Sequence, residues 1–381
     1  MHRFFSYSTL LVVALLALAL GCPDSALDDY NLGVDALERG DTAAALERFE
    51  SSVASRPSDP DAHVNLGVAL LGTGQPERAL AEFKRAEEML PNDVTIHVNL
   101  AEAYKALGRA QPARTEYEYA LRRDPGLVEA HTGYGELLLE TGQYQAATDQ
   151  LLEAISLKPD HAAAQFYLGW VYVRTGRPVE GTHYFVRGLR VDPASVYGRI
   201  GLGESYLARA MPSDALVEFQ KVYAADSTNV HALVGMGDCQ VRLGNYEPAE
   251  RILERALVLA PRNARASKCM GDAFAARGRY PEAVAFYRDA VLRRDDYAEA
   301  YLGLGTALEA GGDLVEAEAA LKSALLHTPK NPEALYRLGQ VYAEMDNPGL
   351  ARSYLEMALD AAGSDGALRA RIRSALDTIP Q

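Results

Sequence analysis

The stretch VNLGVALLGTGQPERALAEF, residues 64–83, keeps glycine inside what is otherwise a helix-forming sequence. Gly67 and Gly74 lie among apolar residues, Ala79 follows, and Phe83 comes four residues later. A glycine in the interior of a helix costs about 1 kcal/mol relative to alanine. Some other interaction must therefore compensate for this cost at Gly67, and the rest of the sequence indicates which one.

The residue types of this stretch return every 34 residues, in ten copies and without an insertion that shifts the register. Stepping by 34 from Ala79 gives alanine in nine copies and glycine in one, and stepping from Phe83 always gives Phe, Tyr or Leu. The position of Gly67 is glycine in nine copies and alanine in one: Gly33, Gly67, Ala101, Gly135, Gly169, Gly203, Gly237, Gly271, Gly305 and Gly339. Such a period is typical of arrays of one repeated supersecondary unit.

Each copy is predicted to be a pair of helices. A glycine at the position of Gly74 suits the left-handed residue that ends a helix, and in the sixth copy this position is Ala210. Proline follows the second helix in most copies and stops it. Gly67 and Ala79 are expected where the two helices cross, because only small side chains let backbones approach. One pair cannot bury its apolar faces alone, so stacking supplies the core.

The pattern of Leu-Gly, Tyr or Leu, Ala, Phe, Ala and Pro at period 34 resembles the tetratricopeptide repeat family. The resemblance covers residues 26–365 and implies an all-α fold, a right-handed α-solenoid of ten helix-turn-helix units. The sixth copy departs most, with Ala210-Met211-Pro212 at its turn, and a bend is expected there. Residues 366–381 are expected to form a capping helix whose arginines face solvent.

The first 21 residues have the features of a signal peptide. Arg3 precedes the eleven apolar residues Leu10–Leu20, which as a helix span about 16 Å, too short for a bilayer core of about 30 Å. The segment Leu18-Ala-Leu-Gly-Cys22 also resembles the relaxed form of the bacterial lipobox.

The lipobox resemblance implies that Cys22 is lipidated and that residues 22–25 form a short tether. A plain signal peptide with a free mature cysteine is the alternative. Pro23, where some lipoproteins have Asp, favours by analogy the outer membrane, with the protein facing the periplasm.

Composition excludes several classes of function. The chain has 48% hydrophobic residues and a formal net charge of −14, so it is a folding sequence that repels nucleic-acid phosphates. Three cysteines make neither a disulfide framework nor a zinc module. Cys239 and Cys269 are interpreted either as two buried apolar side chains or as a disulfide pair.

No catalytic arrangement or cofactor motif stands out, so the chain is predicted not to be an enzyme. The Gly-x-Gly pairs are in phase with the repeat and lie inside predicted helices, not after a strand. His63, His97 and His131 recur at 34 residues, but neighbouring helices about 10 Å apart cannot bring three imidazoles to one metal ion. These histidines are predicted to pack, and no metal and no small-molecule substrate is expected.

Binding in the groove that first helices line in this family is therefore the expected activity. The position after the repeat glycine is acidic in five copies: Glu102, Glu136, Glu204, Asp238 and Asp272. Two interpretations are open for this row, a solvated acidic face or a site for a basic or amine-bearing segment. The first three copies are expected to present no Lys or Arg in the groove, which disfavours capture of a C-terminal carboxylate.

Two further sets fall on groove positions. Asn31, Asn65 and Asn99 lie two residues before the glycine in consecutive copies, either as a ladder for a peptide backbone or as a family default. Phe166, Trp170 and Tyr197 are interpreted as an anchor for a partner side chain, or as filling between first helices.

The hypothesis that follows is a membrane-tethered adaptor lipoprotein. It would bind envelope proteins or peptides in its concave groove and support assembly of a pilus, secretin or cell-wall complex. The alternative is an accessory subunit for exopolysaccharide synthesis or export. Both rest on similarity of architecture to known lipoproteins with these repeats.

Overall fold

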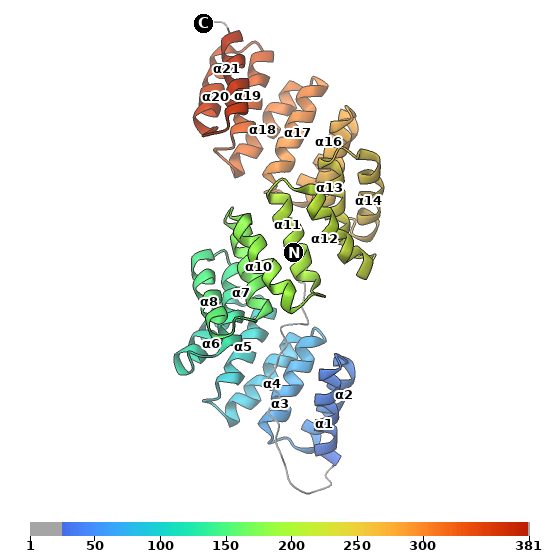
Figure 1. Cartoon of the computed structure of the whole chain (residues 1–381), viewed down its shortest axis with the longest axis vertical. Coiled ribbons are helices and arrows are strands. Elements are labelled where there is room, and N and C mark those ends of the chain that lie inside the picture. The colour runs from blue at the N-terminus through green and yellow to red at the C-terminus, as the bar shows by residue number, and fades with distance from the viewer. Residues whose placement is uncertain (1–24, 380–381) are drawn as a thin grey trace. The chain divides into compact units, whose positions relative to one another are not determined.

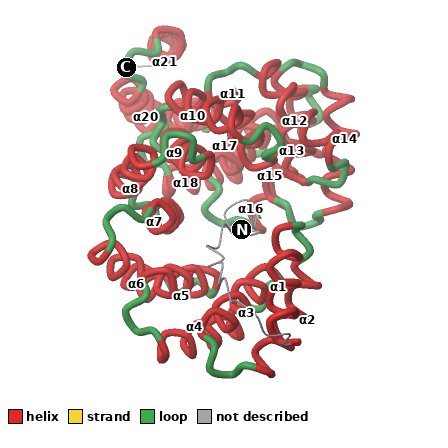
Figure 2. The backbone as a smooth tube through the Cα atoms, turned by 60° about the horizontal axis from the view of Figure 1, so that its bottom comes forward, coloured by secondary structure: helices red, strands yellow, loops and turns green. Residues whose placement is uncertain are grey.

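The computed structural model describes residues 25–379, and within that range the chain forms 21 α-helices and no strand (Figures 1 and 2). The predicted signal peptide and Cys22 lie outside the described residues. The helices fall into two compact units, one ending at Ala208 and the other beginning at Arg209. The boundary lies inside the sixth copy, the copy whose turn departs most from the pattern.

The first unit contains eleven helices. They are α1 (Ser25–Glu38), α2 (Thr42–Ser55), α3 (Pro60–Gly72), α4 (Pro76–Met89), α5 (Val94–Ala106), α6 (Ala110–Arg123), α7 (Val128–Glu140), α8 (Tyr144–Leu157), α9 (Ala162–Arg174), α10 (Pro178–Val191) and α11 (Val196–Ala208).

The second unit contains ten. They are α12 (Pro212–Ala225), α13 (Val230–Arg242), α14 (Tyr246–Leu259), α15 (Ala264–Ala276), α16 (Tyr280–Arg293), α17 (Ala298–Gly311), α18 (Leu314–His327), α19 (Pro332–Glu344), α20 (Pro348–Ala361) and α21 (Gly366–Thr378).

Odd-numbered helices α1 to α19 are the first helices of the repeats, and even-numbered helices are the second ones. Within each unit every helix packs on the next along the chain. Neighbouring first helices also contact each other, whereas neighbouring second helices do not, so the first helices form the inner layer of each unit. The predicted all-α solenoid of stacked helix pairs is confirmed.

Packing between a ring and a glycine explains the small residues of the repeat. A Cβ on Gly33 would lie 2.7 Å from the ring of Phe49, sixteen residues later in the same copy, and a Cβ on Gly67 would clash with Phe83. The rings of Phe49 and Phe83 are fully buried. Glycine thus lets the second helix pack its largest side chain against the first helix. The burial of that ring compensates for the low helix propensity of glycine.

The opposite side of each ring contacts the next copy, again sixteen residues on. A Cβ on Gly235 would lie 2.6 Å from the ring of Phe219, and a Cβ on Gly201 would lie even closer to the ring of Phe185. Where Leu replaces the ring, the residue sixteen positions on is larger, as in Leu151 with Tyr167. In the third to eighth copies the residue sixteen positions on is thus glycine after a ring and larger after Leu, whereas Asn65 and Asn99 follow the rings of Phe49 and Phe83 in the first two.

Left-handed residues end the first helices, as predicted. Glycines with φ between 71° and 83° occupy this position in eight copies: Gly40, Gly74, Gly108, Gly142, Gly176, Gly244, Gly278 and Gly312. Two copies place another residue there, Ala210 with φ 54° and Asp346 with φ 56°. A side chain at positive φ costs about 1–2 kcal/mol, so both turns store strain.

Ala210→Gly is expected to raise the free energy of unfolding by about 1 kcal/mol, because glycine adopts this φ without a Cβ penalty. Urea denaturation followed by circular dichroism measures the change. The reverse change at an equivalent turn, Gly244→Ala, provides the matched control and should lower stability by a similar amount. Equal midpoints for the wild type and both variants would contradict this account of the turn.

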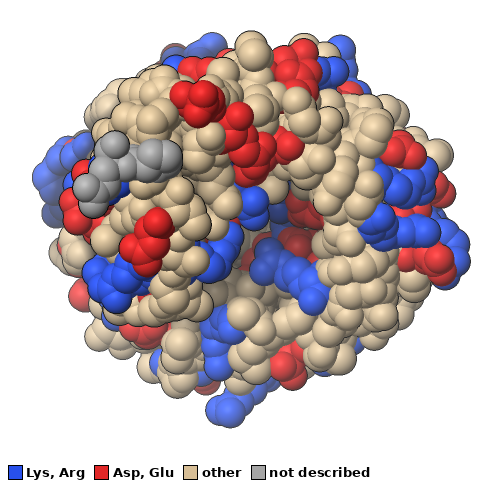
Figure 3. All heavy atoms as spheres, turned by 90° about the horizontal axis from the view of Figure 1, so that it is seen from above, with Lys and Arg blue, Asp and Glu red and all other residues tan. Residues whose placement is uncertain are grey.

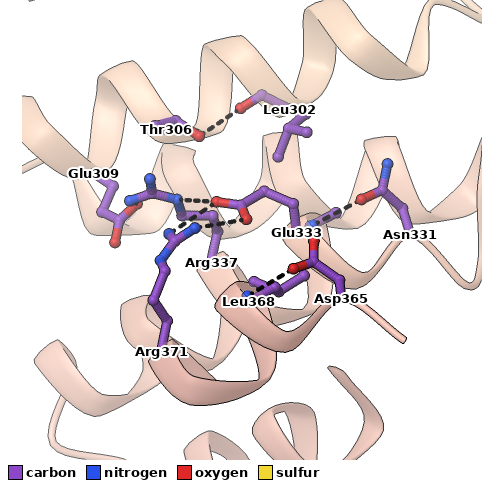
Figure 4. Close-up of polar contacts among 10 residues, drawn as sticks. Leu302, Thr306, Glu309, Asn331, Glu333, Arg337, Asp365, Leu368 and Arg371 are labelled. Carbon is purple, nitrogen blue, oxygen red and sulfur yellow. Dashed lines mark hydrogen bonds and ion pairs between the residues drawn. The ribbon is translucent and has the colours of Figure 1, made fainter. Parts of the chain in front are cut away.

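The last helix, α21, packs on α19 and α20 at the end of the second unit. Leu368 and Ile372 are buried against the preceding helices. Arg371 and Arg373 of this helix are exposed, and Arg371 also donates to both carboxylate oxygens of Glu333 on α19, each at 3.3 Å (Figure 4). Arg369 donates to the carbonyl oxygen of Leu359 at 2.9 Å. These arginines attach the cap as well as solvating it.

Candidate functional site

A charged cluster lies on the inner layer of the first unit, where α5 and α7 face each other. Lys105 Nζ is 2.7 Å from Glu102 Oε2 and 2.5 Å from Glu136 Oε2. The lysine side chain is 13% exposed, and the two carboxylates are 32% and 22% exposed. Burial opposes the charge of Lys105, but attraction to Glu102 and Glu136 holds its pKa well above the ordinary value.

Buried tyrosines surround this cluster. Tyr117 on α6, the ring residue of the third copy, donates its hydroxyl proton to Glu102. Burial and the charge of Glu136 raise the pKa of Tyr167 on α9. A buried phenol needs a polar partner. Glu102 and Glu136 therefore have internal roles, which the interpretation as a simple solvated acidic face did not include.

The second unit repeats this arrangement five copies later. The Tyr287 hydroxyl donates to Asp272 Oδ1 at 2.7 Å, and Lys268 Nζ lies 2.7 Å from Asp272 Oδ2. The ring position is tyrosine in two copies, at Tyr117 and Tyr287. In both copies the residue after the repeat glycine position is an acid, Glu102 or Asp272. The acid at these two positions is thus the acceptor that the inserted phenol requires.

The remaining acids of the row also have partners. Asp238 on α13 accepts from Arg242 Nε at 2.6 Å and from Arg265 at 3.1 Å. Burial opposes this charge, but the two arginines outweigh it and lower the pKa of Asp238. Glu204 lies half-buried on α11. Acidic and basic side chains are interspersed over the face that Figure 3 shows.

The expectation that the third copy has no cation in the groove was wrong. Lys105 is three residues after Glu102, one turn along the same face of α5. The spacing of three residues could therefore have predicted that Lys105 lies next to Glu102. The second bond, to Glu136 in the next copy, joins residues 31 apart and depends on how neighbouring first helices pack.

An aromatic cluster lies beside these charges, on α9 and α11. Trp170 lies 5.6 Å from Phe185 and 6.0 Å from Tyr197, between ring centroids, and Tyr197 also contacts Phe166 at 6.5 Å. The Arg174 guanidinium lies over the indole at 5.9 Å. The structure thus brings together Phe166, Trp170 and Tyr197. Phe166 is buried at 3% exposure and serves packing, whereas Trp170 and Tyr197 are only partly covered.

Trp170 has an unused hydrogen-bond donor. Its Nε1 atom is shielded from solvent and has no hydrogen-bond partner among the described residues. Trp170 is also the single tryptophan of the chain. An indole N–H usually has a partner when it is buried. A ligand that brings an acceptor to this position would satisfy it, so the cluster of Trp170, Tyr197 and Arg174 beside Glu136 is our candidate binding site.

The asparagine row is distributed unevenly. Asn31 is exposed, whereas Asn65 is buried and donates its amide to the Tyr30 hydroxyl at 2.9 Å. Asn99 is 8% exposed, and its Nδ2 atom has no partner in the described part of the chain. Asn65 and Asn99 lie sixteen residues after Phe49 and Phe83, and the row stops at Gly133, where a Cβ would lie 2.5 Å from the Tyr117 hydroxyl.

The recurring histidines attach each first helix to its surroundings. His63 places Nδ1 2.6 Å from Glu82 and Nε2 3.0 Å from the Pro57 carbonyl oxygen, and His97 and His131 repeat this geometry with other partners. No group of three metal-ligating side chains occurs among residues 25–379. Cys239 and Cys269 are buried and not joined by a disulfide.

Family models for the tetratricopeptide repeat match residues 30–94, 98–160 and 137–181, and a second set matches 206–271, 274–330 and 310–376. The chain belongs to the tetratricopeptide repeat family. No curated protein matches its sequence. The period of 34 residues, the helix pairs and the ring-to-glycine packing are this family's fold as it occurs here.

Several solved structures share this fold. A tetratricopeptide repeat protein from Parabacteroides merdae matches at a TM-score of 0.50 with 18% identity, covering 66% of this chain and 99% of that one. The Cut9–Hcn1 hetero-tetramer of the APC/C matches at 0.55 with 14% identity, over 93% and 96%. Yeast Tom70 matches at 0.50 with 13% identity, over 93% and 95%.

Tetratricopeptide repeat proteins commonly bind protein partners and are generally non-enzymatic scaffolds. This chain is accordingly a repeat scaffold for protein–protein interaction. In the part of the chain that the structure describes, every helix is too short or too polar to cross a bilayer.

Proposed function

We propose that the protein is a membrane-tethered lipoprotein scaffold that binds an envelope protein or peptide through the inner layer of its first unit. The observation that carries the binding part is Trp170, a partly covered indole with an unused donor on an inner-layer helix. The tether rests on the sequence before the first repeat, Leu18-Ala-Leu-Gly-Cys22.

The site indicates the chemistry of the bound segment. The rings of Trp170 and Tyr197 suit an apolar or aromatic side chain, and Trp170 Nε1 suits a backbone carbonyl or other acceptor. Three carboxylates (Glu102, Glu136 and Glu140) and two cations (Lys105 and Arg174) lie in the site and the neighbouring cluster, which leaves one net negative charge. That excess is the remaining support for a partner with a basic residue next to its apolar one.

Partner capture from native envelope extracts tests the binding site. Trp170→Ala is expected to lose at least about tenfold of the bound partner, because hot-spot aromatics contribute 2 kcal/mol or more. Trp170→Phe keeps a ring but removes the donor, and its loss should be smaller. Val179→Ala, an exposed aliphatic of the same unit at 62% exposure, is the control. The same bound proteins in equal amounts for all variants would contradict the proposal.

Palmitate labelling tests the tether. The wild-type protein should incorporate palmitate and partition with the outer membrane, and Cys22→Ser should do neither, because lipidation requires that sulfur. An unlabelled wild-type protein released into the periplasm would support the plain signal peptide instead. Loss of exopolysaccharide on deletion, with pili and cell wall intact, would favour the alternative accessory role.

A further inference from the structure

One repeat position on the first helices is charged in only two copies. It lies four residues after the repeat glycine, and in eight copies it is apolar: Leu37, Leu71, Leu139, Val173, Leu207, Val241, Ala275 and Ala343. The third copy has Lys105 there, and the ninth has Glu309. Packing of the repeat thus requires no charge at this position, and the two exceptions need an explanation of their own.

Lys105 shows how the inner layer holds an ammonium group. Its Nζ lies 2.7 Å from Glu102 on the same helix and 2.5 Å from Glu136, which is 31 residues further on in the next first helix. The ninth copy has a carboxylate, Glu309, in place of this ammonium group. Neutral residues replace both of the acids: Thr306 and Gln340.

Glu309 is a buried carboxylate whose charge is poorly compensated. Its side chain is 8% exposed, and Arg337 at 3.4 Å is its one ion-pair partner among the described residues. Arg337 lies closer to Glu333, at 3.0 Å, and Arg371 also bonds to Glu333 (Figure 4). Burial raises the pKa of Glu309 to about 7 against the attraction of Arg337, and repulsion from Glu344 adds to the rise. Glu309 therefore has no cation of its own.

An unused acceptor lies on the face of α19 that meets Glu309. Gln340 is three residues after Arg337, so the two side chains share one face of the helix. The Oε1 atom of Gln340 is shielded from solvent and has no hydrogen-bond donor within residues 25–379. A sheltered acceptor without a donor is unfavourable. Glu309 and Gln340 thus both lack a donor, in the place where Lys105 supplies one in the third copy.

We propose that this part of the second unit binds the ammonium group of a lysine side chain from a partner protein. An ammonium group has three donors and no acceptor, which matches a site whose unused groups are acceptors. Glu309 and Gln340 Oε1 supply two of them, and the exposed Glu344 lies one turn beyond Gln340. Three acids and two arginines leave one negative charge for the ligand: Glu309, Glu333, Glu344, Arg337 and Arg371.

A lysine fits this site better than an arginine. The Lys105 side chain is 13% exposed, so the inner layer already encloses one lysine stem. The low exposure of Glu309 leaves a narrow approach, which suits a charge on a thin flexible stem better than a broad, planar guanidinium. The site lies in the second unit, whereas Trp170 lies in the first. This proposal therefore goes beyond the proposed function, and the two can fail separately.

Calorimetric titration of the full-length mature protein with Nα-acetyl-lysine amide tests the site. The wild type should show saturable binding, and Nα,Nε-diacetyl-lysine amide, which lacks the side-chain charge, should not bind. Glu309→Gln should bind at least tenfold more weakly, and Gln340→Glu, which adds a negative charge, should bind more tightly. The control Glu299→Gln, at an exposed position of the same helix, should stay within twofold of the wild type. Circular dichroism checks that every variant folds.

A variant with a filled site separates binding from folding. Thr306→Glu/Glu309→Lys/Gln340→Glu copies the cluster of Glu102, Lys105 and Glu136 into the ninth copy. The lysine that it introduces occupies the site, so the variant should fold and should no longer bind the ligand. Binding equal to that of the wild type would show that the ligand binds elsewhere.

The affinity should also depend on pH. The ammonium group pairs with the carboxylate form of Glu309, whose pKa is about 7, while the ligand keeps its charge. The affinity of the wild type should therefore rise about tenfold between pH 6 and pH 8, and that of Glu309→Gln should stay constant. Glu309→Gln leaves the other charged groups of the site in place: Arg337, Glu344 and Glu333 on α19, and Arg371 on α21.

Four results would overturn this proposal. The first is no saturable binding at millimolar ligand, and the second is equal binding by Glu309→Gln. The third is binding of glycine amide as tightly as the lysine compound, which would assign the site to a free amino terminus. The fourth is loss of binding in Trp170→Ala, which would place the ligand at the site of the first unit. Unchanged binding in Trp170→Ala is expected even if that variant loses its captured partner.

Discussion

Phe185→Ala is expected to lower the free energy of unfolding of the first unit by about 4 kcal/mol, a typical cost for a Phe-to-Ala change in a core. The ring of Phe185 on α10 is fully buried between two glycines, Gly169 of its own copy and Gly201 of the next. Neither glycine has a side chain that can move into the cavity. The cavity should therefore remain open, and its cost should not be relieved by relaxation.

Urea denaturation of the variant measures this loss. Val179→Ala on the same helix removes an aliphatic side chain that is 62% exposed, and it should change stability by less than about 0.5 kcal/mol. A loss below about 1 kcal/mol for Phe185→Ala would mean that the ring is not the element joining the two copies.

The second large effect concerns Glu309 on α17, beneath the cap (Figure 4). Its side chain is 8% exposed and lies 3.4 Å from Arg337. Burial raises the pKa of Glu309 to about 7, against the attraction of Arg337. Between about pH 5 and 7 the folded protein keeps a proton that the unfolded chain has released. The free energy of unfolding should therefore fall as the pH rises through this range, by about 2 kcal/mol.

Glu309→Gln should remove this pH dependence and stabilise the second unit by about 2 kcal/mol at pH 8, because glutamine needs no proton to be buried. Thermal or urea unfolding at pH 5, 6, 7 and 8 gives the comparison. Glu299→Gln, an exposed position on the same helix, should leave the pH profile unchanged. A profile for Glu309→Gln parallel to the wild type would show that another group titrates.

The fold could be predicted because its determinants are local and repeated. The glycine at the position of Gly67, the ring at Phe83 and the left-handed glycine at Gly74 each recur in phase, and each has one physical role. Ten copies of one pattern make that assignment secure. The grouping of Trp170 with Tyr197 was likewise predictable, since both fall on one side of neighbouring first helices.

The partners of the acidic row were not predictable from the repeat. Tyr117 and Tyr287 occupy a repeat position where the other copies have Phe or Leu. The pattern therefore predicts an apolar side chain there and gives no indication that the hydroxyl groups bond to acids of the row. Lys105 reaches Glu136 across the boundary between copies, so the pair depends on side-chain geometry and not on periodicity. The same holds for Asp238 with Arg265. The orphan donor of Trp170 is visible only in the structure.

A double-mutant cycle on Phe185 and Gly201 tests most directly the claim that ring and facing residue are matched in size across copies. The double variant Phe185→Leu/Gly201→Cys installs the pair Leu253/Cys269 that the chain uses two copies later. Gly201→Cys alone should cost about 1–3 kcal/mol through its clash with the ring.

Phe185→Leu alone should cost about 1 kcal/mol through the space it leaves. The double variant is expected to lose less free energy of unfolding than the two single variants lose together, by at least about 1.5 kcal/mol. Urea denaturation under reducing conditions measures the three losses. Strictly additive losses would contradict this expectation.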